Sequence, residues 1–372
     1  MQKAFRFRIF PSRAQKRVLE SQLALCCELY NAALQERRDA WQTRRKSINY
    51  HAQAIQLPGI KIERPEIRLV HSQVLQQTLK RLDKAFDAFF RRLKSGEKPG
   101  FPRFRSRFRY NSLTYPQSGF GVESGKLRLS KVGRIKLKLH RAIEGEIRTL
   151  TISRSATGKW FACFSVETDS QPLPASDESV GIDMGLKSFA TLSTGEQIDN
   201  PRFFRCDEKA LAKAQKKLSA IPKRAPERKK VHKVIARGHE RISNRRKDFA
   251  HQLSRYLVNK FGIIVFEKLN IRGMLRNHCL AKSIADAAWS QTIQFTAYKA
   301  EEAGRIEVEV NPRNTSKTTF CCGEIVDITL SDRVIHCPKC LSVTDRDWNA
   351  SLNIQALGLQ SLPHLRIEAA PL

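Results

Sequence analysis

The chain has 372 residues and a formal net charge of +31 at pH 7, with 67 Lys and Arg against 36 Asp and Glu. Such a cationic excess attracts polyanions through counterion release, so a nucleic acid is the expected partner. No apolar run approaches the ~20 residues of a membrane-spanning helix, and the charge is spread along the whole chain, which argues against a membrane partner. The length indicates two or three domains.

Cysteine content and the first residues both favour a cytoplasmic protein. Residues 1–10 alternate charged and aromatic side chains and lack the apolar core of a signal peptide. Nine cysteines, an odd number, favour reduced thiols, of which clustered ones are available to a metal.

The N-terminal region predicts one strand and two helices. Residues 1–10 alternate as a half-buried strand with one basic face does. Ser12 and Gln15 have the spacing of a capping box, and apolar residues continue at helical spacing towards Trp41. A second helix is predicted over 70–93, and the two helices form a small helical subdomain.

A cationic and aromatic segment follows at 98–110, where prolines prevent a helix. Guanidinium groups suit phosphate, so we expect these side chains to bind nucleic acid. The aromatic rings could stack on bases or pack inward. The arginines are Arg103, Arg105, Arg107 and Arg109.

Short strands separated by glycines are predicted over 119–167, as a small β-barrel or sheet, and the polar stretch 170–178 as a linker. A strand over 179–183 then begins a three-strand meander. Two helices follow, broken around Pro222 and Pro226. The second carries a basic ridge that we expect to contact nucleic acid, formed by Arg237, Arg241 and Arg245.

The apolar run 262–266 predicts a central strand, followed by a helix over 284–302 and an alternating strand over 305–310. Three carboxylates stand where apolar side chains are expected. Asp183 closes the strand that follows the linker, and Glu267 directly follows the central strand.

The third carboxylate, Asp347, opens a helix predicted over 347–356. Phosphodiester hydrolysis by two divalent cations needs hard oxygen ligands from several directions. Two strand ends and a helix start supply them in the order that a ribonuclease-H-like nuclease requires. Asp345 competes with Asp347 for this role, and Asp286 is either an auxiliary ligand or a structural hydrogen-bonding residue.

Four cysteines near the C-terminus predict a zinc ribbon, with a β-hairpin between the two pairs. Cys337 and Cys340 form one half-site, and Cys321 and Cys322 the other. The second half is irregular because Thr319 stands where a Cys-x-x-Cys pair would place its first thiolate. His336 is an alternative ligand, and a site without zinc is the alternative to the ribbon.

Six segments of the chain carry a resemblance to a known family: 3–11, 100–106, 180–191, 265–274, 311–316 and 345–350. They resemble the TnpB family, RNA-guided nucleases encoded by insertion-sequence transposons and related to type V CRISPR effectors. The departures from the family pattern are Thr319, in place of the usual first cysteine, and Leu341, in place of a glycine.

The resemblance implies a mixed α/β, multidomain fold. Its parts would be a wedge β-barrel over 1–10 and 110–175, an inserted helical recognition domain over 11–109, an RNase H-like RuvC nuclease domain over 176–314 and 343–372, and a zinc-ribbon insert that binds target nucleic acid over 315–342.

The resemblance also implies an RNA-guided DNA endonuclease, acting at the nucleoid of a prokaryotic cell. Its catalytic acids would be Asp183, Glu267 and Asp347, holding two Mg²⁺ ions, or Mn²⁺ in their place. A structural Zn²⁺ would be held by Cys321, Cys322, Cys337 and Cys340. The partners would be a guide RNA derived from the transposon end and double-stranded target DNA, cut beside a short flanking motif.

Two alternatives remain open. One is a DNA-binding repressor that does not cleave, although the presence of all three acids favours a competent nuclease. The other is a transposase that joins DNA strands, which the order of the acids and the cysteine ribbon disfavour.

Overall fold

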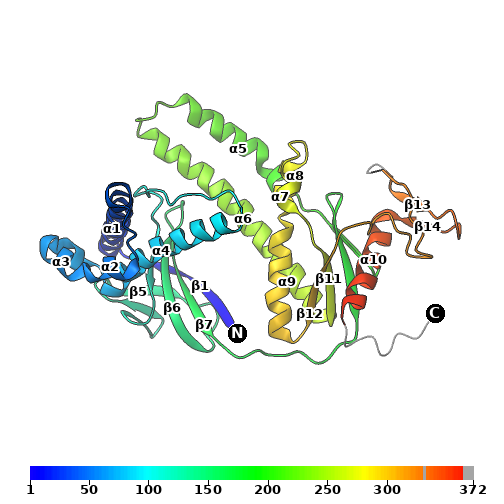
Figure 1. Cartoon of the computed structure of the whole chain (residues 1–372), viewed down its shortest axis with the longest axis horizontal. Coiled ribbons are helices and arrows are strands. Elements are labelled where there is room, and N and C mark those ends of the chain that lie inside the picture. Colours follow the sequence, from blue (N-terminus) through cyan, green and yellow to red (C-terminus); the bar gives the residue numbers. More distant parts are fainter. Residues whose placement is uncertain (330–331, 363–372) are drawn as a thin grey trace. The chain divides into compact units, whose positions relative to one another are not determined.

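The computed structural model describes residues 1–329 and 332–362, and the chain divides after Asp169 into two compact units (Figure 1). Residues 168–178 have no regular secondary structure, which confirms the predicted linker. None of the helices in the described part of the chain is both long and apolar enough to cross a membrane.

The first unit contains a near-closed barrel of seven antiparallel strands in the order β2-β6-β7-β1-β5-β4-β3. Phe5, Phe7 and Ile9 of β1 point into its core, as the alternation predicted. The strands are Gln2–Phe10 (β1), Ser112–Tyr115 (β2), Phe120–Glu123 (β3), Lys126–Leu129 (β4), Gly133–Lys138 (β5), Glu146–Arg154 (β6) and Trp160–Glu167 (β7).

All helices of the first unit lie between β1 and β2, so the helical part is inserted into the barrel as predicted. The capping box is formed: the Gln15 amide donates to Ser12 Oγ at 3.2 Å, and the Ser12 amide donates to Gln15 Oε1 at 3.0 Å. The helices are Arg13–Arg44 (α1), Tyr50–Ile55 (α2), Leu57–Glu63 (α3), the 3₁₀ turn Pro65–Leu69 and Ser72–Lys94 (α4).

The second unit contains a mixed sheet in the order β10-β9-β8-β11-β12. Strands β8, β11 and β12 are parallel, whereas β9 and β10 continue from β8 as the predicted antiparallel meander. The strands are Ser179–Met184 (β8), Ser188–Leu192 (β9), Gln197–Asp199 (β10), Ile263–Glu267 (β11) and Ile306–Val310 (β12).

The helices of the second unit confirm the break around Pro222 and Pro226, but the single helix predicted over 284–302 is wrong. It divides at Ala288, whose φ of 56° is left-handed. The break lets Ile284 and Trp289, five residues apart, both pack into the same core, whereas a continuous helix would point them in different directions. The helices are Phe203–Ala220 (α5), Glu227–Lys260 (α6), Ile271–Met274 (α7), Ala281–Ala287 (α8), Trp289–Ala303 (α9) and Arg346–Ser361 (α10).

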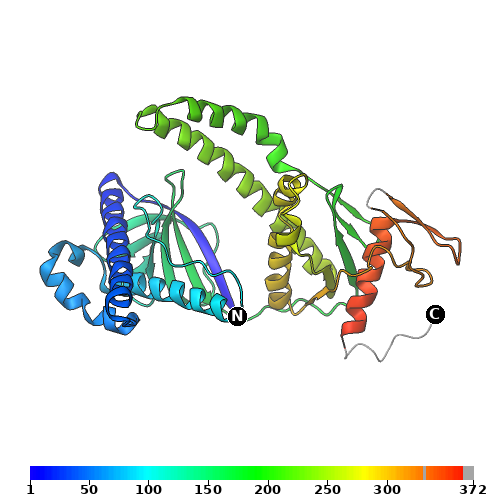
Figure 2. The same cartoon turned by 45° about the horizontal axis from the view of Figure 1, so that its top comes forward.

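The two faces of this sheet bury different helices, with α10 on one face and α6 and α9 on the other (Figures 1 and 2). Ile182 and Phe266 pack in one core with α6 and α9, whereas Val265 packs with Ile354 of α10. Gly181 lies on the α10 face, where a side-chain Cβ would overlap the backbone of that helix. Because strand residues alternate between faces, Asp183 shares the α10 face with Gly181.

Lys299 is a buried cation between α9 and α6. Its side chain is 4% exposed, and its Nζ donates to the His251 carbonyl at 2.7 Å and to Ser254 Oγ at 2.6 Å. Burial lowers the pKa of Lys299 to about 8. Between pH 8 and 10.5 the unfolded chain therefore binds more protons at this site, so stability rises with pH across that window.

We expect Lys299→Met to raise the free energy of unfolding at pH 7 by about 1 to 3 kcal/mol, because the charge that burial disfavours is removed. The gain should shrink towards pH 10. Urea denaturation at several pH values measures it, with the exposed Lys213→Met as the control. A pH-independent difference between the variant and the wild type would contradict this account of Lys299.

Candidate active site and cysteine cluster

Asp183 and Glu267 lie at the same edge of the sheet. Strands β8 and β11 are parallel neighbours, and their register pairs Ile182 with Phe266. The next residue of each strand is a carboxylate, so the two acids emerge side by side on the α10 face. Glu267 is only 9% exposed, and Asp183 is partly buried.

Asp347 is in the first turn of α10, which packs against β8. Asp345 is the N-cap: its Oδ1 accepts hydrogen bonds at 3.0 Å from the amides of Asp347 and Trp348. The Trp348 indole donates to the Ser193 carbonyl at 3.0 Å and so holds the start of the helix against the turn after β9. Because Asp345 is occupied as the cap, Asp347 is the better ligand candidate.

Electrostatics show that the three acids form one cluster. Burial first, and then the charges of Glu267 and Asp347, raise the pKa of Asp183 to about 7. Burial also raises the pKa of Glu267, opposed by a hydrogen bond from Thr315 Oγ1. Carboxylates that repel one another at a partly buried site are suited to divalent cations, which bind hard oxygen ligands.

Within the described residues, the ion pairs at these acids are formed with Asp347, although the Arg346 charge also lowers the pKa of Asp183. Arg346 contacts the Asp347 carboxylate at 3.1 Å, and Arg333 approaches it at 3.8 Å. No ion pair involves Asp183 or Glu267 within the described residues. The donor set therefore fits the predicted metal site.

Segment 315–320 connects the acids to the cysteines. The Thr315 hydroxyl donates to Glu267 Oε1 at 2.5 Å, and Asn353 of α10 donates to the Thr315 carbonyl at 2.9 Å. Asn349 donates to the Thr318 carbonyl at 2.7 Å and accepts from the Phe320 amide at 2.8 Å. Sequence reasoning missed these residues, although Thr315 and Asn349 belong to motifs that carried the family resemblance.

The four predicted cysteines come together, with every Sγ within 4.8 Å of the others. Cys321 Sγ lies 2.9 Å from that of Cys340, and Cys322 Sγ lies 3.2 Å from that of Cys337. Tetrahedral zinc with Zn–S bonds of ~2.3 Å would space its sulfurs by ~3.8 Å, so small outward shifts would complete a site. Backbone hydrogen bonding from Cys340 lowers the pKa of Cys337 to about 6, which favours the thiolate that binds metal.

The predicted position of the hairpin is wrong. Val334–His336 (β13) lies between the two cysteine pairs as predicted, but its partner Val343–Asp345 (β14) follows Cys340, so the hairpin encloses Cys337 and Cys340. His336 is an exposed strand residue outside the cysteine cluster, which disfavours it as a ligand. Thr319, in contrast, is buried, and its Oγ1 lies 3.6 Å from Cys322 Sγ.

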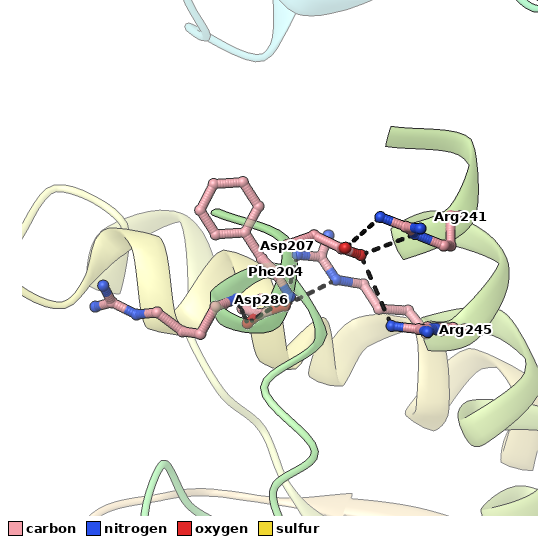
Figure 3. Close-up of polar contacts among 7 residues, drawn as sticks. Phe204, Asp207, Arg241, Arg245 and Asp286 are labelled. Atoms are coloured by element: carbon pink, nitrogen blue, oxygen red, sulfur yellow. Dashed lines mark hydrogen bonds and ion pairs between the residues drawn. The ribbon is translucent and has the colours of Figure 1, made fainter. Parts of the chain in front are cut away.

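Two arginines of the basic ridge on α6 form ion pairs within the protein. Arg241 and Arg245 both form ion pairs with Asp207 of α5, the latter at 3.7 Å (Figure 3). Arg237 is exposed. The ridge therefore helps to hold α5 against α6, which its spacing alone did not indicate.

Asp286 has the structural role that was one of its two predicted alternatives. Its carboxylate accepts a hydrogen bond at 2.8 Å from the Phe204 amide, at the start of α5, where the N-cap Arg202 supplies no side-chain bond (Figure 3). Arg246 donates to it at 2.7 Å. Asp286 thus caps α5 from a distant part of the chain.

The sheet order, with two acids at its strand ends and a third at the start of α10, and the cysteine cluster define a RuvC-like fold with a cysteine-bearing insert. Three family models match the chain. Residues 162–278 match the IS605 OrfB family, described as "Probable transposase", and 289–354 match "Cas12f1-like, TNB domain". Residues 1–46 match a helix-turn-helix domain, although here they form β1 followed by the single long helix α1.

Similar full-length proteins place the chain in a family. A "Putative RNA-guided DNA endonuclease" of Streptomyces pristinaespiralis is 36% identical, over 96% of this chain and 90% of the relative. The "Putative RNA-guided DNA endonuclease InsQ" of Escherichia coli K12 is 29% identical, over 95% and 92%. The chain belongs to the TnpB (IS605 OrfB) family.

The solved structure of the mini-RNA-guided endonuclease CRISPR-Cas phi3 has a similar fold. Its TM-score is 0.50 at 9% identity, covering 98% of this chain and 93% of that one. At such low identity the likeness concerns the fold alone, and it agrees with the mixed α/β multidomain architecture predicted from the sequence.

Proposed function

We propose that the protein is an RNA-guided DNA endonuclease that cuts DNA complementary to a guide RNA from the transposon end, beside a short flanking motif. The observations that support the proposal are the place of Asp183 and Glu267 at the ends of neighbouring parallel strands and the electrostatic effect of Asp347 on Asp183. The net charge of +31 suits a protein that holds both a guide RNA and its target.

The three acids would hold two Mg²⁺ or Mn²⁺ ions. When bound, such a pair supplies an activated water and stabilises the leaving oxygen of the phosphodiester. Asp183 and Glu267 provide ligands from rigid strand ends, and Thr315 orients the Glu267 carboxylate. Asp347 adds a ligand from the opposite element, α10, and its contact with Arg346 would rearrange on metal binding.

The parts of the chain would divide this work. The wedge over 1–10 and 110–175 and the recognition domain over 11–109 would contact the guide and the flanking duplex. The RuvC-like domain over 176–314 and 343–372, of which 363–372 lie outside the described residues, would cut. The ribbon over 315–342 would bind Zn²⁺ and target nucleic acid. Exposed arginines at 103, 105, 107, 109 and 237 would contact phosphates.

The direct test is to sequence the RNA that co-purifies with the protein, then to offer the complex a plasmid library with the matching target beside randomised flanks. With Mg²⁺ we expect cleavage of members that share one short flanking sequence. Binding without cleavage of any member would indicate the repressor instead. Covalently joined DNA ends would indicate the transposase.

A further inference from the structure

The backbone of residues 98–110, here named the strap, is fixed to α1. The Arg105 amide donates to Asn31 Oδ1 at 2.8 Å, and Asn31 Nδ2 donates back to the Arg105 carbonyl at 2.9 Å. Cys27 Sγ also donates to this carbonyl, at 3.2 Å. Because these bonds use backbone groups of the strap, they do not occupy its arginine side chains, of which only that of Arg105 lies over a ring, that of Tyr30, within the described residues.

The aromatic residues near the two ends of the strap are anchored by packing. The Phe101 ring contacts those of Phe86 and Phe89 in α4, with centroids 5.5 and 5.4 Å apart. Tyr110 is buried, and its hydroxyl lies 3.2 Å from Thr78 Oγ1. The strap is therefore a fixed element of the first unit.

Phe108 is the exception among these rings. It lies in a turn closed by hydrogen bonds from the Arg109 and Tyr110 amides to the Ser106 carbonyl, at 2.9 and 3.1 Å. Its side chain is 88% exposed, and it makes no ring contact within the described residues. Hydrogen bonds therefore fix the backbone of this turn, yet the apolar ring that it carries lies in solvent. The ring adds nothing to the hydrophobic core.

The charges around Phe108 indicate which kind of ligand its ring would contact. Arg107 and Arg109 flank it, both are exposed, and neither forms an ion pair in the part of the chain that the structure describes. A single exposed apolar residue is ordinary by itself. An exposed ring between two unneutralised guanidinium groups, however, matches a single-stranded nucleic acid, in which phosphates alternate with bases whose faces are open to stacking.

We propose that Phe108 stacks on an unpaired nucleobase while Arg107 and Arg109 contact the phosphates on either side of it. This inference rests on the proposed function and makes it more specific, because it assigns single-strand binding to one turn. The shared ligand chemistry is a base with its two flanking phosphates, which a guide RNA or a displaced DNA strand could supply.

The test uses full-length protein freed of nucleic acid at high salt, and single-stranded RNA and DNA oligonucleotides that contain 2-aminopurine. Phe108→Ala should weaken binding about 5- to 100-fold and reduce the fluorescence change of 2-aminopurine, because one stacking contact is lost. Phe108→Trp should restore both. The slope of log affinity against log salt should stay unchanged in Phe108→Ala, but Arg107→Gln should lower it by about 0.7.

The control is Ile55→Ala, which removes an apolar side chain that is 79% exposed on α2. It should bind as the wild type does, and Phe108→Ala should keep the wild-type Tm. Loss of binding to one oligonucleotide type supports the inference and identifies the strand. Wild-type affinity of Phe108→Ala for both types, or a marked fall in its Tm, overturns the inference alone. Failure of the wild type to bind either oligonucleotide would overturn the proposed function itself.

Discussion

Asp183→Asn should abolish DNA cleavage and, in the absence of metal, make the protein more stable. Cleavage should fall by on the order of 10³-fold or more, because a metal ligand at the reacting centre supplies several kcal/mol of transition-state stabilisation. Binding of guide and target should persist, since Asp183 lies at a strand end and its side chain forms no hydrogen bond or ion pair within the described residues.

The stability gain follows from the pKa of Asp183. Its value of about 7 in the folded protein lies above the ordinary 3.8, so the folded state binds more protons between these values. The contribution of this group to stability is fully present below pH 4 and is lost as the pH rises through 7. Asparagine cannot ionise, so at pH 8 the variant should be more stable by on the order of 1 to 3 kcal/mol.

Thermal denaturation in a chelator at pH 4 and pH 8 measures this difference, which should be present only at the higher pH. Added Mg²⁺ should raise the Tm of the wild type and leave that of Asp183→Asn nearly unchanged, because the ion binds only the folded wild-type site. Asp327→Asn, at an exposed surface pair with Lys317, is the matched control. If Asp183→Asn still cleaves DNA at the wild-type rate, Asp183 does not belong to the active site.

The carboxylates could be found from the sequence because each interrupts a strong local pattern. Central parallel strands are apolar throughout, so an acid that follows such a run must lie at an end of the sheet. Asp183 and Glu267 are both of this kind. The choice of Asp347 over Asp345 depended on its neighbours in the sequence, and the structure adds the physical reason, since Asp345 caps the helix.

What the sequence could not supply are contacts between distant segments. The break at Ala288 follows from the buried packing of Ile284 and Trp289, and no glycine or proline marks it. Asp286 resembles any helical aspartate until it meets the amide of Phe204. The bonds from Asn349 and Asn353 to segment 315–320 likewise arise only when α10 is placed beside the cysteine cluster.

Those bonds give the cysteine cluster a consequence for catalysis. Segment 315–320 both contacts Glu267 through Thr315 and begins the ribbon, so loss of the cluster should loosen a proposed ligand of the active site. Cys337→Ser removes a buried thiol from the centre of the cluster. We expect this variant to lose zinc, to unfold at a Tm several degrees lower, and to cleave at least about tenfold more slowly.

A pair of variants can decide which thiols bind the metal. If Cys321 is a ligand, Cys321→Ser should lose zinc, as measured by metal analysis of the purified protein. Adding Thr319→Cys should then restore it, because the Thr319 side chain already lies 3.6 Å from Cys322 Sγ and 3.8 Å from Cys337 Sγ. The double variant would carry the regular Cys-x-x-Cys spacing, with Cys322, Cys337 and Cys340 unchanged.

Full zinc content in Cys321→Ser would show that Cys321 is not needed to bind zinc. A zinc-free wild-type protein would show that the ribbon does not bind zinc at all. Cleavage provides the second readout. Because the ribbon reaches Glu267 only through Thr315, restored zinc in the double variant should restore cleavage in parallel. If zinc returns in the double variant but cleavage does not, the threonine at position 319 is itself needed to position the segment. Its hydroxyl donates a hydrogen bond to the Glu324 carbonyl at 3.0 Å, which a cysteine would weaken.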